Sequence, residues 1–279
     1  MNIGIIGLGL IGGSLGLRLQ KNEHTIYGLT NNPLNKRKAE ARKLANFVSC
    51  DLNILKECTL IILALPIKEL INPSKALIKA IPSEAVITDV GSIKEPIINT
   101  WEKIHPLFVG SHPMAGTEMQ GVDSGHINLF DNAKWVVTPT QQTNPKSLST
   151  IKNLIQSLGC DLVEISPSTH DQSVALISHL PIFLSSCLIA SANTTKNIEL
   201  LNTSKKLAST GFSDTSRVGS GNPHLGLDLA HYNKKNIIKS LSMFKSHLND
   251  IEKLISNENW DKLLDQLEKN KHSRSDFCN

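Results

Sequence analysis

Residues 2–14 read Asn-Ile-Gly-Ile-Ile-Gly-Leu-Gly-Leu-Ile-Gly-Gly-Ser, and they carry the strongest signal for the fold of the first half of the chain. A short aliphatic run, Asn2–Ile6, leads directly into a glycine-rich turn, and a helical pattern follows over Leu10–Gln20. In this context the first glycine permits the tight turn, the second lets the main chain approach a pyrophosphate, and the third lets helix and strand pack closely. The helix N-terminus adds unpaired N–H groups and the positive end of a dipole. We therefore predict a dinucleotide site that includes Gly7, Leu8, Gly9, Leu10, Ile11 and Gly12.

Short aliphatic runs alternate with helix-length segments through the rest of the first half. Such alternation is typical of a parallel, doubly wound sheet, and an unbroken run such as Leu60–Leu63 suits a strand buried on both faces. We predict an α/β Rossmann-type domain over residues 1–166, with a helix over Lys146–Leu158. The predicted strands are Asn2–Ile6, Thr25–Leu29, Leu60–Ala64, Ala85–Thr88, Phe108–Gly110, Trp135–Thr138 and Leu162–Ile165.

The pattern changes after Ile165. Ser166-Pro167-Ser168 is typical of a helix start, and no strand pattern follows, so we predict an all-α domain over residues 167–279. A last short helix carries Trp260 and three leucines. Before it, six apolar residues form an a/d seam on one helix face: Ile237, Leu241, Phe244, Leu248, Ile251 and Ile255. This seam is either the inner face of a core helix or an interface with a partner subunit.

The composition argues against several classes of protein. The 279 residues are 40% hydrophobic, enough for a core, and the net charge of +4 comes from scattered basic residues rather than a basic, aromatic patch. The N-terminus lacks the positive charge of a signal peptide, and the apolar run around Leu180–Ala192 is too short to span a bilayer. The five cysteines are too dispersed for a zinc site or disulfide framework. We expect a cytoplasmic protein that binds no nucleic acid, membrane or metal.

The end of the second predicted strand bears on the choice of dinucleotide. An NAD-selective enzyme usually carries Asp or Glu there to bind the ribose 2′-hydroxyl, but residues 27–32 read Tyr-Gly-Leu-Thr-Asn-Asn. Thr30 and Asn31 can donate hydrogen bonds to a 2′-phosphate. Arg37 or a neighbouring lysine can add charge, although Lys36–Lys43 can equally be a solvated helix face. We expect NADP as the cofactor, with NAD as the alternative.

Two polar stretches follow predicted strands. One is Asp89–Lys94, which contains Ser92, and the other is Ser111–Thr117, which contains His112. Ligands of such sheets bind outside the carboxyl ends of the strands. A lone histidine is more often structural than catalytic, but the position of His112 just past a strand of a dinucleotide-binding sheet makes it a candidate catalytic residue.

Five motifs resemble those of the prephenate/arogenate dehydrogenase family, in the family's order and over nearly the whole chain, with cyanobacterial arogenate dehydrogenases the nearest members. They are GLGLIGGS from Gly7, DVGSIK from Asp89, SHPMAGTE from Ser111, ISHLP over Ile177–Pro181 and DTSRVGSGNP over Asp214–Pro223. The resemblance implies a Rossmann-type domain followed by a 6-phosphogluconate-dehydrogenase-like helical dimerisation domain, and a homodimer. It also implies NAD(P)-dependent oxidative decarboxylation of a cyclohexadienol in tyrosine biosynthesis. It favours arogenate, which gives tyrosine, over prephenate, which gives 4-hydroxyphenylpyruvate.

The resemblance also implies roles for single residues. His112 matches the catalytic histidine that accepts the 4-hydroxyl proton, and Ser92 matches a serine that hydrogen-bonds that hydroxyl. Arg217 matches an arginine that holds a substrate carboxylate, and His179 matches a second substrate-facing histidine. The structural alternatives are a helix cap for Ser92, a buried histidine at a bend near Pro181, and a salt bridge between the arginine and Asp214. Glu118 and Asp214 are weaker candidates for orienting these groups.

Leu65 and Pro66 match a cofactor-binding loop, where relatives often place a hydroxyl residue before the proline. Leu65 can contact the cofactor only by its main chain or by packing. The arginine that many NADP-selective relatives carry beside Thr30 and Asn31 is also missing. These departures leave the cofactor preference open between NADP and NAD.

Two rival interpretations remain. Other oxidoreductases with a Rossmann and a helical domain, such as hydroxyacid dehydrogenases or imine reductases, lack the combination of SHPMAG with SHLP and TSR. A non-catalytic NADP-binding sensor would not need His112, Ser92 and Arg217 together. We also expect a monofunctional enzyme without a chorismate-mutase domain or a separate regulatory domain.

Overall fold

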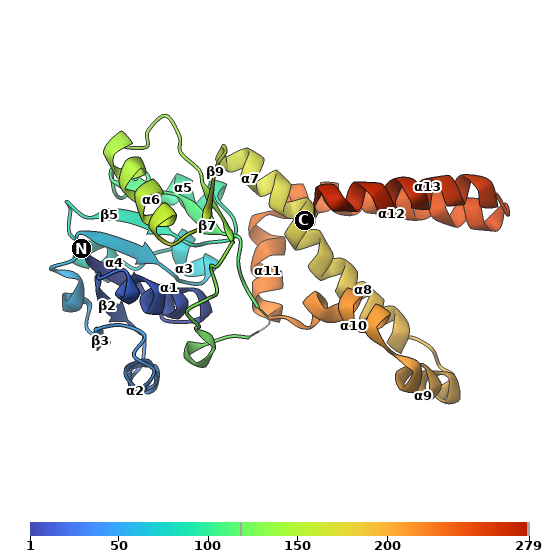
Figure 1. The fold of residues 1–279 in the computed structure, drawn as a ribbon, viewed down its shortest axis with the longest axis horizontal. Helices are drawn as coiled ribbons and strands as arrows, with labels where there is room; N and C mark the ends of the chain where they lie inside the picture. Colours follow the sequence, from blue (N-terminus) through green and yellow to red (C-terminus); the bar gives the residue numbers. More distant parts are fainter. Residues whose placement is uncertain (118, 278–279) are drawn as a thin grey trace. The chain divides into compact units, whose positions relative to one another are not determined.

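The computed structural model describes residues 1–117 and 119–277, so Glu118 and Cys278 lie outside the described residues. The chain divides into two compact units, Met1–Lys234 and Lys235–Asn279. The first unit holds the predicted dinucleotide-binding sheet together with the helices that follow it, and the second is a pair of helices (Figure 1).

A six-stranded parallel sheet forms the centre of the first unit. Its strands pair in the order β3-β2-β1-β4-β5-β6, with β1 hydrogen-bonded to both β2 and β4. The order reverses beside β1, which makes the sheet doubly wound and confirms the predicted fold class. The strands are β1 Asn2–Ile6, β2 Thr25–Leu29, β3 Phe47–Ser49, β4 Leu60–Leu63, β5 Val86–Asp89 and β6 Phe108–Val109.

Helices connect these strands and cover the sheet. Every residue of β4 is buried, as the unbroken aliphatic run predicts, and β1 and β4 contribute to one core with Leu15 and Leu19 of α1. The helices are α1 Leu10–Lys21, α2 Pro33–Ala41, α3 Ile67–Ile71, α4 Lys75–Ala80, α5 Glu95–Trp101 and α6 Pro145–Ser157, with short 3-10 turns at Leu52–Leu55 and Val122–Ser124.

A second, three-stranded sheet corrects the prediction for the region around His112. The chain leaves the large sheet at Gly110, where a side chain would lie only 2.8 Å from atoms of Ile98 and Thr138, and then forms β7. His112 therefore lies within a strand, opposite Val136, rather than in a loop past a strand end. The strands are β7 Ser111–Pro113, β8 Lys134–Val137 and β9 Asp161–Glu164, with β7 antiparallel and β9 parallel to β8.

The remainder of the first unit is helical, as predicted. The hydroxyl of Ser166 accepts a hydrogen bond from the main-chain N–H of Thr169 and caps α7, which confirms the predicted helix start. Among the described residues no strand follows β9. The elements are α7 Pro167–Val174, a π-helical turn at Ala175–His179, α8 Leu180–Asn193, α9 Ile198–Leu207, α10 Thr210–Ser216, a 3-10 turn at Arg217–Ser220 and α11 Pro223–Tyr232.

One helical stretch is longer than the sequence suggested. The wide turn at Ala175–His179 carries the helix past Pro181, so that Pro167–Asn193 forms one run of 27 residues with a mean hydropathy of 1.9 in its most apolar window. By length and composition alone this run could cross a membrane, which corrects the expectation that no stretch is long enough. It nevertheless carries the buried polar side chains of His170, Asp171 and His179.

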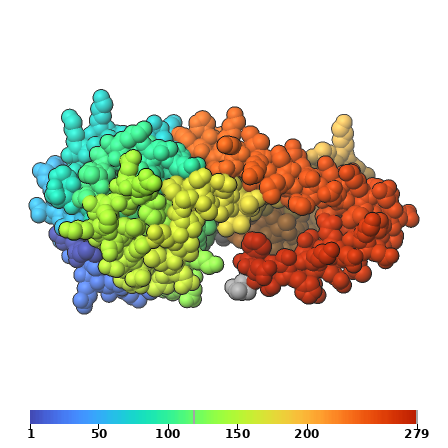
Figure 2. Space-filling model, turned by 90° about the horizontal axis from the view of Figure 1, so that it is seen from above, coloured from blue at the N-terminus to red at the C-terminus, as the bar shows by residue number. Residues whose placement is uncertain are grey.

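The second unit is a helical hairpin. Helix α12 spans Lys234–Ser256 and α13 spans Trp260–Ser273, and the two lie side by side (Figure 1). The predicted apolar seam is partly covered: Ile237 is buried, Leu241, Phe244 and Ile251 are half-buried, and Leu248 and Ile255 are 51% and 49% exposed. The space-filling view shows the exterior of these helices in orange and red (Figure 2). The two alternatives for the seam, a core face and a partner interface, therefore both stay open.

Candidate active site

A cleft of about 1440 Å³ in the first unit brings together the residues that the sequence singled out. The glycine loop, the end of β2, the segment after β4 and the β5–α5 turn line it, together with residues around His112 and the helices after Ser166. All ten predicted cofactor-binding residues and three of the four predicted catalytic or substrate residues are part of the lining. They are Gly7, Leu8, Gly9, Leu10, Ile11, Gly12, Thr30, Asn31, Leu65, Pro66, Ser92, His112 and Arg217.

The glycine loop has the geometry that a pyrophosphate needs. Gly7 has a φ of +93°, and a side chain there would collide with the carbonyl of Ala64. A side chain on Gly9 would meet nothing within 4 Å, so the main chain at this point is open to the cleft. A side chain on Gly12 would lie 1.9 Å from the carbonyl oxygen of Gly7. Because glycine has no side chain, α1 can pack close to the strand at this point. Because no side chain caps α1, its first N–H groups can bind phosphate oxygens.

The end of β2 presents amides rather than a carboxylate. The Thr30 hydroxyl donates to the carbonyl of Asn32 at 3.3 Å, so it already has a partner within its own loop. The exposed Asn31 accepts hydrogen bonds from the side-chain amides of Asn32 and Asn35. This end of the strand is therefore neutral, and the side chains of Asn31 and Asn35 both line the cleft.

His112 is the start of a buried chain of hydrogen bonds. Its Nδ1 lies 2.9 Å from Nε2 of His170, and Nδ1 of His170 lies 2.7 Å from Oδ1 of Asp171. The two imidazole rings meet edge to face, with centroids 5.1 Å apart. Helix α7, which is distant in sequence, thus supplies the second and third members of the chain.

The partners of Asp171 determine which ring nitrogen carries each proton. Its carboxylate accepts hydrogen bonds from the main-chain N–H groups of Lys94 at 2.6 Å and Glu95 at 2.9 Å. Since this carboxylate acts as an acceptor, Nδ1 of His170 must carry a hydrogen, and the neutral ring then accepts at Nε2. His112 consequently donates from Nδ1 and keeps a lone pair on Nε2, the nitrogen left for the cleft.

Asp171 also decides between the two interpretations of Ser92. Helix α5 begins at Glu95 after Lys94, and the Asp171 carboxylate caps it from α7. Ser92 therefore does not cap the helix, and its half-buried side chain lies at the cleft. His170 and Asp171 were not among the predicted site residues; the only sign of them in the sequence is a polar His-Asp pair early in a predicted helix.

A second buried network lies beneath His112. The ammonium of Lys94 and the carboxylate of Asp89 are both fully buried and form an ion pair, and Lys94 also donates to the carbonyl of Ser111 at 2.6 Å. The other Asp89 oxygen accepts from the N–H of Ser111 at 3.1 Å. Both groups of the pair thus hold the strand that carries His112. Lys94 is the last residue of the DVGSIK motif, and no role was predicted for it from the sequence.

The structure does not bring His179 to the cleft. Its side chain is completely buried, Nδ1 lies 3.2 Å from the side-chain amide of Asn233, and the ring also interacts with the main chain of Ser92. Asn233 also donates to the main-chain carbonyl of Asp171 at 2.8 Å. His179 is therefore a neighbour of the His170–Asp171 pair, while the exposed Arg217 lines the cleft.

Comparison with known proteins identifies the family. The nucleotide-binding domain of prephenate dehydrogenase matches residues 15–164, and the dimerization domain of prephenate dehydrogenase matches residues 166–269. The chain belongs to the prephenate dehydrogenase family. A prephenate dehydrogenase of Bacillus subtilis is 32% identical over 90% of this chain and 68% of its own length. Members of this family are NAD(P)-dependent oxidoreductases of aromatic amino acid biosynthesis, and the resemblance seen in the motifs is confirmed.

Solved structures of family members have the same fold. The arogenate dehydrogenase of Synechocystis is 38% identical, covers 99% of this chain and 100% of its own, and superposes with a TM-score of 0.82. The prephenate dehydrogenase of Aquifex aeolicus, in complex with hydroxyphenyl propionate and NAD+, is 28% identical, covers 99% and 98%, and superposes with a TM-score of 0.92. These similarities support the view that this chain binds a nicotinamide cofactor and a small-molecule substrate.

In this prephenate dehydrogenase fold, burial keeps the central histidines neutral. Burial holds the pKa of His112 well below 6.5, and the nearby His170 and Lys94 lower it further. Burial lowers the pKa of His170 as well, while its hydrogen bond to Asp171 acts in the opposite direction. Burial lowers the pKa of His179 to about 4. His112 can therefore accept a proton over the whole physiological pH range.

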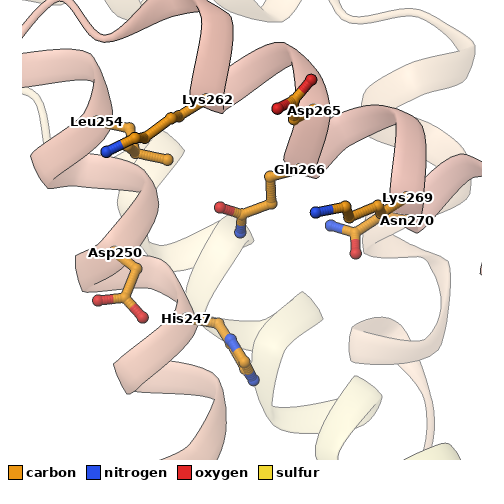
Figure 3. Close-up of a pocket in the computed structure, with 8 residues that line it drawn as sticks. All are labelled: His247, Asp250, Leu254, Lys262, Asp265, Gln266, Lys269 and Asn270. Atoms are coloured by element: carbon orange, nitrogen blue, oxygen red, sulfur yellow. The ribbon is translucent and has the colours of Figure 1, made fainter.

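A separate polar groove of about 550 Å³ lies between α12 and α13 (Figure 3). Its side chains include Asp250 and His247 from one helix and Lys262, Asp265 and Gln266 from the other. The groove lacks a glycine loop and a buried titratable group, so we place the chemistry in the cleft of the first unit.

Proposed function

We propose that this protein is an arogenate dehydrogenase that converts arogenate to tyrosine, with NADP as its preferred cofactor. The observation that carries the proposal is the buried, neutral His112, which donates from Nδ1 to His170 and keeps Nε2 as an acceptor for the cleft. Arogenate is favoured because identity to the Synechocystis arogenate dehydrogenase, at 38%, exceeds the 28% to the Aquifex prephenate dehydrogenase.

The side chains of the cleft suit the proposed reaction. A bound nicotinamide would supply the hydride acceptor for C4 of the substrate ring. The ring carboxylate leaves as CO₂, and the electron pair of the broken C–C bond completes the aromatic ring. His112 Nε2 accepts the 4-hydroxyl proton, because loss of hydride from C4 makes that proton acidic. Ser92 hydrogen-bonds the same hydroxyl and aligns it with the imidazole. Arg217 binds a substrate carboxylate through the two parallel donors of its guanidinium group.

The ring that accepts the proton is oriented by its partners. The ring keeps its Nδ1–H bond to His170 throughout, so the imidazolium forms without a change of tautomer. Asp171, whose oxygens are held by the N-terminal end of α5, orients His170. We assign His170 and Asp171 as positioning residues, and His179 as a buried support of this pair rather than a direct ligand.

The glycine loop, Leu65 and Pro66 would hold the dinucleotide. The neutral end of β2 supports the NADP preference, because a carboxylate there would repel a 2′-phosphate, whereas the side-chain N–H₂ group of Asn31 can donate to it. Loss of preference for NADP over NAD in steady-state kinetics would refute this part of the proposal.

We further propose a dinucleotide-binding domain over residues 1–166, a substrate-binding and dimerisation domain over residues 167–279, and a cytoplasmic homodimer. The boundary agrees with the matched families, which meet between residues 164 and 166. The exposed apolar residues of α12 and α13, among them Leu248, Leu264 and Leu267, are suited to contact a second subunit. Sedimentation equilibrium on the whole protein tests the dimer.

The function is tested by NADPH and NADH formation from purified enzyme, with arogenate and prephenate supplied separately. Turnover of arogenate with NADP is the expected result. Turnover of prephenate alone would keep the chemistry but reverse the substrate. Tight NADP binding without turnover of either compound would support a non-catalytic sensor and refute the role of His112.

A further inference from the structure

The Gly-Gly-Ser sequence at residues 12–14 has a second contact besides the dinucleotide site. It packs against the turn at Gly121–His126, which we call the docked turn. A side chain on Gly125 would lie 3.1 Å from both the carbonyl carbon of Gly13 and the nitrogen of Ser14. The fully buried Ser14 hydroxyl accepts a hydrogen bond from the N–H of His126 at 2.9 Å. This close approach attaches the docked turn to α1.

Helix α2 holds the docked turn from the other side. The guanidinium of Arg42 donates to the carbonyls of Val122 and Gly125, the latter at 2.7 Å. Lys38 forms an ion pair with Asp123, but these side chains are 43% and 62% exposed, so this pair contributes less. Arg42 is thus engaged with main-chain carbonyls of the docked turn, whereas Lys38 remains partly exposed.

The docked turn continues into a wall of the cleft. Met119, Gln120, Gly121 and Val122 all line it. Val122 is 7% exposed and belongs to the same core as Leu8 of the glycine loop. The wall therefore lies on the dinucleotide side of the cleft, and its position depends on contacts that α1 and α2 make outside the cleft.

We propose that Arg42 and Ser14 are positioning residues that hold the docked turn, and through it the cleft wall at Met119–Val122, in place for the dinucleotide. The proposal rests on dinucleotide binding in this cleft and is independent of the choice between arogenate and prephenate. Because the Arg42 donors are directed to main-chain carbonyls, we expect its effect on NADP and NAD to be equal.

The test compares Arg42→Met, which keeps the aliphatic stem, with Arg37→Met, a matched control at an exposed position of the same helix. Amide hydrogen exchange over residues 119–126 is measured without ligand, and the Kd values for NADP and NAD are measured by calorimetry. In Arg42→Met we expect faster exchange of the docked turn and about a tenfold rise in both Kd values, the effect of losing charge-assisted hydrogen bonds. Arg37→Met should match wild type in the exchange measurement and in NAD binding.

Two outcomes would overturn the proposal. A rise in the Kd for NADP alone, with unchanged exchange, would show that Arg42 contacts the 2′-phosphate directly. Unchanged exchange and unchanged Kd values would show that the wall needs no such anchor. If Arg42→Met does not fold, Ser14→Ala tests the same contact from α1, with an expected rise of about threefold in both Kd values from one neutral hydrogen bond; unchanged values there would equally refute the proposal.

Discussion

Nδ1 of His112 donates a hydrogen bond to Nε2 of His170 across 2.9 Å, although 58 positions separate the two residues in the sequence. The direction of this bond follows from Asp171, whose carboxylate holds the opposite nitrogen of His170. His112 therefore lines the cleft as one defined tautomer, in which Nδ1 donates to His170 and Nε2 can accept a proton. The order His112–His170–Asp171 explains how an imidazole within a β-strand is kept ready to accept a proton.

Replacement of His112 by asparagine removes the proton acceptor but keeps a polar side chain of similar reach. We expect kcat to fall by about 10²- to 10⁴-fold, the usual contribution of a general base, with the Kd for the dinucleotide unchanged. Single-turnover kinetics and calorimetry measure the two effects. Near-wild-type turnover would contradict the proposed mechanism.

Replacement of His170 by phenylalanine keeps a buried ring but removes the acceptor for His112 Nδ1–H. We expect kcat to fall by about 100-fold because His112 is no longer held in the productive tautomer, while KM changes little. The acidic limb of the pH–rate profile should also shift, which a merely structural role of His170 would not cause. His247→Phe, at an exposed position outside the cleft, is the control; an equal loss in both variants would rule out the positioning role.

The pH dependence of kcat/KM should reflect the lowered pKa of His112. The neutral ring is the active form, and burial holds its pKa well below 6.5, so activity persists as the pH falls through 6.5 and declines only at more acidic pH. Initial rates between pH 4.5 and about 8, with a correction for reversible unfolding, measure this limb. A midpoint at or above 6.5 would mean that the His112 ring is solvated during the reaction.

His179 should make the protein less stable in acid. Its pKa is about 4 in the folded protein and 6.5 as the reference value, so between these values the unfolded chain binds a proton that the folded protein does not. The free energy of unfolding is therefore highest above pH 6.5 and falls as the pH drops towards 4. From this group alone the loss is about 2 kcal/mol at pH 5.

His179→Asn tests that linkage, because asparagine does not titrate. Urea unfolding at pH 7 and pH 5 should show a smaller difference in the variant than in wild type, by about 2 kcal/mol. The variant is expected to be less stable than wild type at pH 7, where a buried packing contact is lost, so only the difference between the two pH values decides the outcome. Equal differences in wild type and variant would show that His179 is protonated alike in the folded and unfolded states.

Local features of the sequence predicted the sheet and the dinucleotide loop well. The aliphatic runs at β1 and β4, the glycines between Gly7 and Gly12 and the Ser166 cap act over a few residues, and their conformations follow from main-chain sterics, side-chain periodicity and capping. Prediction was less successful where a short strand depends on a distant partner. Strand β3 was missed, and His112 was placed after a strand rather than within β7, because pairing with β8 is a tertiary contact.

The class of fold, the place of the dinucleotide and the family motifs follow from the sequence alone, since they depend on neighbouring residues and their order. Which distant groups meet is set by tertiary packing. It places His170 and Asp171 behind His112, buries Lys94 against Asp89, leaves His179 outside the lining of the cleft and engages Arg42 with the docked turn. The physical reason is that burial and hydrogen-bond partners, which set tautomers and pKa values, arise from packing between elements far apart in the chain.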